Sequence, residues 1–130
     1  MKKIADLSLV DGISLAAAKG KPKKAGRILA KSLARECSFF TPQLAVEFAA
    51  CLLRAINTGK PEVPPAIYKR IARWPIKRAA YLAAKQPEAG MRVLAGIVFE
   101  HLTKKQGLSR NEILEFTTQF LNGFIPVSQL

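Results

Sequence analysis

The run of residues 41–57, TPQLAVEFAACLLRAIN, limits most strongly what this chain can fold into. Thr41 is a favourable helix N-cap, and Pro42 suits the first helical position, where a backbone N–H has no helical acceptor. Gly59 follows as an expected C-terminal stop. Apolar side chains cover this helix on all but one narrow stripe. Because a helix of that kind is buried, we predict that residues 41–57 form the central helix of a small bundle.

The composition favours a single all-α domain. The chain has 130 residues, of which 49% are hydrophobic and 23% are charged, so it can form a core and is not typical of a disordered protein. Alternating strand patterns are almost absent. We therefore predict one domain over residues 1–130, a compact all-α bundle of five to six helices. The further helices are expected at about residues 24–37, 65–74, 75–85, 87–105 and 109–122, with a short helix or turn within residues 3–18.

Glycine and proline predict where these helices are interrupted. Residues 19–27, KGKPKKAGR, are expected to form a flexible basic loop, because their two glycines and one proline disfavour regular structure until the end of the segment. Pro75 predicts a kink or break after Trp74 in the basic segment of residues 65–85. Ser109 and Glu112 have the spacing of a capping box. The wheels of these helices place Ile67, Leu82 and Leu114 on the core side.

Two pairs of segments raise the hypothesis of an internal duplication. TPQLAVEFAACLL, from Thr41, aligns with SRNEILEFTTQFL, from Ser109, and AGRILA, from Ala25, aligns with AGMRVLA, from Ala89. Each pair would form one helical hairpin, and the two hairpins would be joined by the kinked basic helix. The alternative is that capped amphipathic helices resemble one another without common descent.

Positive charge is the strongest functional signal. The net charge is +12, and residues 1–85 contain 17 Lys and Arg but 5 Asp and Glu, whereas the remaining residues are balanced at 4 and 4. The first basic patch is a helical stripe with its preceding loop: Lys21, Lys23, Lys24, Arg27, Lys31 and Arg35. The second patch interleaves cations with aromatic rings: Lys69, Arg70, Arg73, Trp74, Lys77, Arg78 and Tyr81. Cations neutralise phosphates and rings stack on bases or support arginine, so this pattern suits nucleic acid. The alternative is that both patches are solvated helix faces.

Catalysis, metal binding and cofactor binding have little support in the sequence. The single histidine, His101, lies among apolar residues and is interpreted as a packing residue. Cys51 lies in the apolar helix, and two cysteines without a framework of further pairs favour a reducing compartment, hence a cytoplasmic location. No run approaches the length of a membrane span. We therefore expect no enzyme activity, no cofactor, no metal site and no membrane span.

Residues 101–116, HLTKKQGLSRNEILEF, resemble a helix-turn-helix DNA-binding motif, with Gly107 in the turn and Ile113 where the second helix needs a core contact. Thr103 and Gln106 depart from the small and apolar residues usual at their positions. The resemblance implies that Arg110 and Asn111 would face a groove of DNA. The alternative is a plain helical hairpin.

Two functional hypotheses follow. The first is a small, non-catalytic protein that binds DNA or RNA through phosphate contacts of the two basic patches. The second is a helical adaptor or inhibitor that docks an acidic protein on the same basic surface, with the neutral C-terminal part available as a homodimer face. If the two patches lie together on one face, nucleic acid is favoured; if they lie on opposite sides, the adaptor gains. Binding to a membrane surface ranks third, because the basic helix has no aromatic anchor.

Overall fold

The structure is a computed structural model that describes residues 4–18 and 21–125. Within this part of the chain it contains seven α-helices and no strand, so the predicted all-α fold is confirmed and the helix count is close to the predicted five to six. The α-helices are α1 (Leu9–Ala18), α2 (Pro22–Glu36), α3 (Pro42–Thr58), α4 (Pro65–Tyr68), α5 (Ile76–Lys85), α6 (Pro87–Glu100) and α7 (Arg110–Asn122). Two 3₁₀ turns, η1 (Ile4–Asp6) and η2 (Ile71–Arg73), and a π-helical segment, η3 (His101–Lys105), complete the order.

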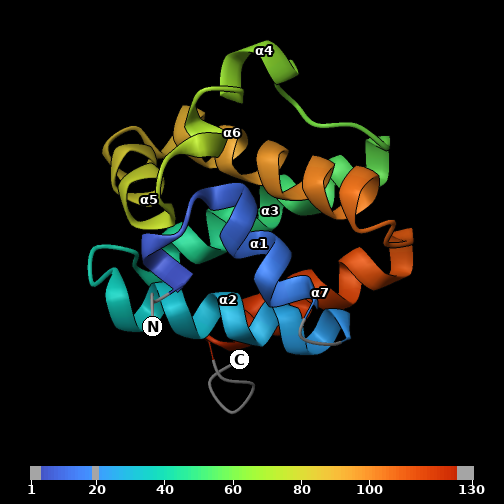
Figure 1. The fold of residues 1–130 in the computed structure, drawn as a ribbon, viewed down its shortest axis with the longest axis horizontal. Coiled ribbons are helices and arrows are strands. Elements are labelled where there is room, and N and C mark those ends of the chain that lie inside the picture. The colour runs from blue at the N-terminus through green and yellow to red at the C-terminus, as the bar shows by residue number, and fades with distance from the viewer. Residues whose placement is uncertain (1–3, 19–20, 126–130) are drawn as a thin grey trace.

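The main packing partners are not neighbours in the chain. Helix α2 packs along α7, α3 packs along α6, and α3 also contacts α7. Helix α1 lies between α2 and α6, α5 packs on α6, and α4 covers the outer side of α6 (Figure 1). Helix α2 of the first pair thus packs on α7 of the second, and α3 packs on α6. Two related hairpins could exchange partners in this way, and the internal duplication stays a prediction.

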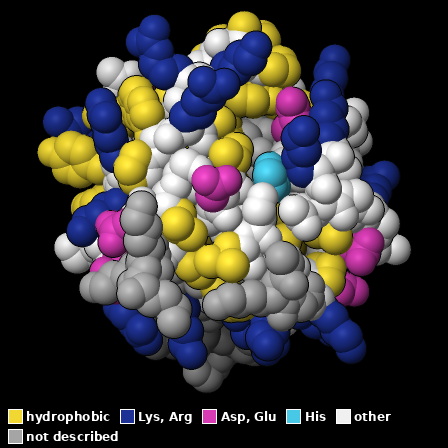
Figure 2. All heavy atoms as spheres, viewed as in Figure 1, with side chains coloured by type: hydrophobic (Ala, Val, Ile, Leu, Met, Phe, Trp, Pro, Cys, Tyr) yellow, Lys and Arg dark blue, Asp and Glu magenta, His cyan; other side chains and the backbone are white. Residues whose placement is uncertain are grey.

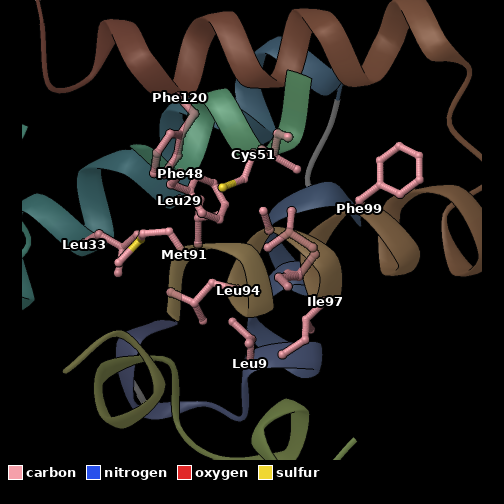
Figure 3. Packing of buried hydrophobic residues seen from close by; sticks show 14 of the residues in the cluster. Leu9, Leu29, Leu33, Phe48, Cys51, Met91, Leu94, Ile97, Phe99 and Phe120 are labelled. Carbon is pink, nitrogen blue, oxygen red and sulfur yellow. The ribbon is translucent and has the colours of Figure 1, made fainter. Parts of the chain in front are cut away.

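Helix α3 is central, as its apolar run predicts. It buries seven side chains, among them Phe48, Cys51 and Leu52, in a core that includes residues of α1, α2, α5, α6 and α7. Figure 3 shows Phe48 and Cys51 of α3 among Leu29 of α2, Met91 of α6 and Phe120 of α7. The ring centroids of Phe48 and Phe120 are 4.9 Å apart. The core is therefore continuous from one pair of helices to the other.

The predicted caps define both ends of α3 and the start of α7. The Thr41 hydroxyl oxygen accepts a hydrogen bond from the Leu44 amide at 3.3 Å, and Gly59 ends the helix at φ 79°. At α7, the Glu112 amide donates to the Ser109 hydroxyl at 3.2 Å, and the Ser109 amide donates to the Glu112 carboxylate at 2.9 Å. Local sequence alone is sufficient for these boundaries, because each bond lies within one helical turn.

The predicted basic loop over residues 19–27 is wrong for most of its length. Residues 19 and 20 lie outside the described residues, Lys21 is the N-cap, and α2 begins at Pro22. Gly26 lies inside the helix, where a Cβ atom would stand 2.3 Å from the Phe116 carbonyl oxygen of α7. Gly26 therefore acts as a site of close helix packing rather than as a helix breaker, and proline at the first helical position is compatible with helix formation.

The predicted helix over residues 65–74 is also wrong in part. It is divided into the single turn of α4 and the 3₁₀ turn η2, whereas the predicted break at Pro75 is confirmed, with Trp74 extended at ψ 154°. The N-terminal segment holds this break. The Leu9 amide donates to the Trp74 carbonyl at 2.7 Å, and the Ile76 amide donates to the Leu7 carbonyl at 2.9 Å. These bonds compete with helix continuation, which the local sequence does not reveal.

Four side chains that were expected in the core are exposed, and one of them is Leu53 of α3, so the polar stripe of that helix is wider than predicted. Ile67 is 56% exposed because the single turn of α4 directs its neighbour Tyr68, only 5% exposed, toward α6 instead. Leu82 and Leu114 stand at the borders of the buried faces of α5 and α7. The helix predicted over residues 87–105 differs only in its last part, which widens into the π-helical η3.

Candidate nucleic-acid interface

The first basic patch lies on one regular helix. Every cation of α2 is exposed, as is the N-cap lysine that precedes it: Lys21, Lys23, Lys24, Arg27, Lys31 and Arg35. Lys24 and Arg35 are eleven residues apart, so at 1.5 Å per residue the stripe extends over about 16 Å of helix. The opposite side of α2 buries Ala25, Leu29 and Leu33 in the core, which fixes the orientation of the charged side.

A groove runs between α2 and α7, and three residues of the first patch line it. Lys24, Arg27 and Lys31 contribute from α2, and Gln119 and Asn122 contribute from α7. We call this cavity of about 650 Å³ the α2–α7 groove. Ile28 and Gly123 complete its lining, which contains no Asp or Glu. Three cations and two amides therefore line one hollow.

Two glycines set the distance between the helices of this groove. A Cβ atom on Gly26 would clash with the backbone of Phe116, and a Cβ atom on Gly123 would lie 2.5 Å from the Ala30 side chain. Without these side chains α2 and α7 approach closely. The close approach brings the amides of Gln119 and Asn122 next to the cations of α2.

The cations of the α2–α7 groove are available to a ligand. Lys24, Arg27 and Lys31 form no ion pair with any residue of the described part of the chain. The ion pairs that are present there join Arg54 and Arg92 to Glu62, and Lys104 to Glu100, on other elements. A phosphate bound in the groove would therefore not have to displace a carboxylate of residues 4–18 or 21–125.

The second basic patch divides into two parts. Lys69 and Arg73 line a second hollow of about 460 Å³ beneath α4, which we call the α4 pocket, together with Lys104 and Lys105 of η3. Arg70 is exposed and does not line this pocket. The break at Pro75 separates these residues from the cations Lys77 and Arg78 of α5.

The aromatic residues of the second patch support cations of the protein itself. The Arg78 guanidinium carbon lies 4.5 Å from the centre of the Trp74 ring, and the Lys85 ammonium lies 4.7 Å from the centre of the Tyr81 ring. The edge of Phe39 also meets Tyr81, with ring centroids 5.4 Å apart. Both rings therefore support a cation, which is one of the two roles expected for them, and Tyr81 is in addition 47% exposed.

The two basic patches do not form one groove. The α2–α7 groove and the α4 pocket have no lining residue in common, and α1 lies between the elements that carry them. In Figure 2, Lys and Arg side chains gather over the α4–α5 end of the molecule and again along the α2 edge, with hydrophobic, acidic and uncharged side chains between them. A single flat ligand would therefore contact one patch at a time on this face.

The remaining candidate residues have packing roles. Cys37 and Cys51 are both free and buried, and burial raises the pKa of the Cys37 thiol to about 11, which disfavours its thiolate at neutral pH. His101 is half-buried, and its Nε2 atom lies 2.6 Å from the Ser14 hydroxyl. Within residues 4–18 and 21–125, no three His, Cys, Asp or Glu side chains are grouped so that they could hold a metal ion.

Sequence reasoning assigned no binding role to four residues that line these hollows. Gln119 and Asn122 were visible as surface residues of the last helix, and Lys104 and Lys105 form an adjacent basic pair, but each meets its basic partners only in the tertiary structure. By contrast, Arg110, at the start of α7, donates a hydrogen bond to Asn57 at 3.2 Å. Helix α7 packs on α2 and α3 and makes few contacts with α6, so the packing does not decide between a plain helical hairpin and a helix-turn-helix motif, and the motif stays a prediction.

None of the described helices combines the length and the apolar character needed to cross a membrane. Comparison of the chain with protein-family models, with curated proteins and with solved structures finds no match.

Proposed function

We propose that this protein binds nucleic acid without catalysing a reaction, and that the α2–α7 groove is its phosphate-binding surface. The observation that carries the proposal is the row of Lys24, Arg27 and Lys31, which are exposed, face one groove and form no ion pair with a described residue. Release of counterions from a polyanion would supply most of the binding free energy.

The spacing of the cations suits a strand of phosphates. A duplex rises 3.4 Å per phosphate of one strand, so the stripe of about 16 Å from Lys24 to Arg35 spans about five phosphates. Helix α2 holds this spacing, because its buried side is fixed against α7 and the core. Contacts from the three cations of the groove, or from all four cations of the stripe with Arg35, predict that affinity falls roughly 40- to 150-fold between 50 and 200 mM salt.

The amides across the groove suit a second kind of contact. Gln119 and Asn122 both donate and accept hydrogen bonds, so they can bond sugar or base atoms of a strand whose phosphates meet α2. A groove that contained cations alone would attract any polyanion. The pairing of cations with amides favours nucleic acid over a purely acidic surface.

One observation favours the second candidate function, an adaptor that docks an acidic protein. The two basic hollows lie on different elements and share no lining residue, so their cations do not line one continuous groove. A folded acidic partner could use either hollow without following a strand. A protein whose partner is an acidic protein would not prefer one form of nucleic acid over another. The two functions therefore predict different binding results.

The test is fluorescence anisotropy of labelled duplex DNA, single-stranded DNA and hairpin RNA over a salt series. The proposal predicts binding that persists near 150 mM salt and ranks one form above the others. Binding that is equal for all three forms and is lost at that salt concentration would contradict it. In that case a pull-down with acidic proteins would test the adaptor.

Charge reversal gives a matched comparison. Arg27→Glu places a carboxylate in the groove, whereas Lys60→Glu makes the same change of charge at an exposed residue that lines neither hollow. We expect Arg27→Glu to weaken binding at least tenfold more than Lys60→Glu, with thermal midpoints that stay close to wild type. Equal losses would mean that only the overall charge matters and would contradict the proposal that the α2–α7 groove binds the phosphates.

A further inference from the structure

The α4 pocket is distinct from the proposed nucleic-acid surface and has a different chemistry. Its floor is apolar and includes Val10 of α1, Ala72 of η2 and Ile97 of α6. Its volume of about 460 Å³ lies within the range typical of sites for small molecules. This hollow combines an apolar base with cations from two separate elements, whereas the lining of the α2–α7 groove pairs cations with amides.

Cations approach the pocket from two walls. Lys69 and Arg73 belong to the α4–η2 wall, and Lys104 and Lys105 belong to η3 on the other wall. The one carboxylate of the lining, Glu100, accepts a hydrogen bond from the Tyr68 hydroxyl and lies 3.8 Å from the Lys104 ammonium. Glu100 is therefore already occupied, and Lys69, Arg73 and Lys105 have no ion-pair partner in the described part of the chain.

Polar groups at the base of the pocket are held in fixed positions. The Nε2 atom of His101 lies within hydrogen-bond distance of the Ser14 hydroxyl of α1. Tyr68 is buried against α6. Because Gly96 of α6 has no side chain, the Tyr68 ring can lie 3.1 Å from the position that a Cβ atom of Gly96 would occupy. These contacts join η3 to α1 and α4 to α6. The site is therefore formed before any ligand arrives.

We propose that the α4 pocket binds a small organic phosphate, namely a phosphate monoester carried on an apolar or aromatic body. A phosphate monoester has close to two negative charges at neutral pH and three acceptor oxygens, so it can contact cations of both walls at once. A carboxylate carries only one charge. The apolar floor accounts for the body of the ligand, because inorganic phosphate would leave Val10, Ala72 and Ile97 uncovered.

The single histidine is a built-in reporter of this pocket. His101 is the only histidine of the chain, so one imidazole signal in the NMR spectrum of untagged protein belongs to the pocket lining. Burial, followed by the charge of Lys105, lowers the pKa of His101, and Asp11 opposes this shift. The other charged groups of the lining are Lys69, Arg73, Glu100 and Lys104. A bound dianion would add negative charge nearby and raise the pKa of His101.

The experiment titrates the full chain with phenyl phosphate, inorganic phosphate and phenol while the His101 signal is recorded. We expect phenyl phosphate to bind about tenfold more tightly than either fragment, because it alone combines the charge with the apolar body. A rise in the pKa of His101 should accompany saturation. The proposal is overturned if phenyl phosphate leaves the His101 signal unmoved or binds no better than inorganic phosphate.

Two neighbouring arginines provide the variant and its control. Arg73 lines the pocket and Arg70 does not, although both are exposed and belong to the same segment. We expect Arg73→Glu to weaken phenyl phosphate binding at least tenfold and Arg70→Glu to change it less than twofold. Similar effects of the two variants would overturn the assignment to this pocket. Circular dichroism of both variants checks that the helices remain folded.

A phosphate monoester could belong to a free metabolite or to the end of a nucleic-acid strand. A trinucleotide with a 5′-phosphate, compared with the same trinucleotide bearing a 5′-hydroxyl, distinguishes the two sources. Binding of the phosphorylated form that exceeds binding of phenyl phosphate identifies a strand end, and weaker binding identifies a free molecule. Because the α2–α7 groove is tested by Arg27→Glu, failure of either proposal leaves the other intact.

Discussion

The α2–α7 groove and the α4 pocket are both basic, but different supports hold their cations. Helix α2 is a fifteen-residue helix whose backbone packs directly on α7 at Gly26. The α4–η2 wall consists of one helical turn and one 3₁₀ turn, and its main anchor is the buried ring of Tyr68. The groove therefore depends on contact between backbones, whereas the pocket depends on one side chain and its hydrogen bond.

This difference indicates what each surface can recognise. Cations on a long, fully packed helix keep a regular spacing, which suits a repeating ligand such as a strand of phosphates. Cations on the short α4–η2 wall and on η3 reach one hollow from different elements, which suits a compact ligand. The same two residue types, Lys and Arg, thus acquire different binding properties from the elements that carry them.

The largest effect is expected where the two helix backbones meet. Gly26→Ala would place a Cβ atom 2.3 Å from the Phe116 carbonyl oxygen, and neither backbone can move without disturbing the core. We expect a loss of about 3 kcal/mol in the free energy of unfolding, at the upper end of overpacking costs. The thermal midpoint should fall by roughly 10 °C.

Gly96→Ala is the matched control in the other region. The nearest atom to a Cβ there belongs to the Tyr68 side chain at 3.1 Å, so a shift of a few tenths of an ångström relieves the contact. Alanine also favours a helix more than glycine does, so the net change should lie within about 1 kcal/mol. Equal losses in the free energy of unfolding for the two variants would contradict the distinction between a groove held by backbone packing and a pocket held by a side chain.

A smaller loss is expected when the anchor of the α4 wall loses its polar contact. Tyr68→Phe keeps the buried ring but removes the hydrogen bond to the Glu100 carboxylate. We expect a loss of about 1.5–2 kcal/mol, at the lower end of the range for hydrogen bonds to charged groups. Urea unfolding with an unchanged slope against denaturant would measure it, and a neutral result would show that the ring alone anchors α4.

The pH dependence of stability tests the base of the pocket. Because the pKa of His101 is lowered in the folded protein, the unfolded chain binds more protons as the pH falls through the ordinary histidine range. Stability from this group is thus present above the unfolded pKa and lost at lower pH. His101→Gln should flatten the curve of unfolding free energy between pH 7 and 5. An unaltered slope would mean that other groups dominate this range.

The smallest effect is expected at the exposed cation over Trp74. Arg78→Ala removes the guanidinium that lies 4.5 Å from the ring centre, and exposed pairs of this kind contribute about 0.5–1 kcal/mol. Trp74 is the only tryptophan, so its fluorescence reports the change directly. Lys77→Ala on the same helix is the control and should leave the emission unchanged.

The parts of the fold that depend on local chemistry could be predicted from the sequence. The ends of α3, the capping box of α7 and the break at Pro75 each depend on a few adjacent residues. Gly26 could not be assigned correctly, because a glycine that breaks a helix and a glycine that admits a neighbouring helix look alike until that neighbour is known. The loop predicted before α2 was wrong for this reason.

The candidate sites show the same limit. The spacing of Lys24, Arg27, Lys31 and Arg35 is enough to predict one basic side of a helix. Tertiary packing determines which residues of other helices lie beside these cations. The sequence therefore assigned Gln119 and Asn122 of α7 no part in binding. The second patch is continuous in sequence but divides in space, because Pro75 and its bonds to the N-terminal segment redirect the chain.

The pairing of α2 with α7 also has a kinetic consequence. Gly26 and Phe116 meet although about ninety residues separate them in the chain, and α3 likewise pairs with α6 rather than with the helix next to it. Helical proteins usually fold quickly because their contacts are local, whereas distant contacts require closure of long loops before they become favourable. Stopped-flow refolding should therefore be slower than for up-and-down bundles of similar size, with a rate closer to that of mixed α/β domains.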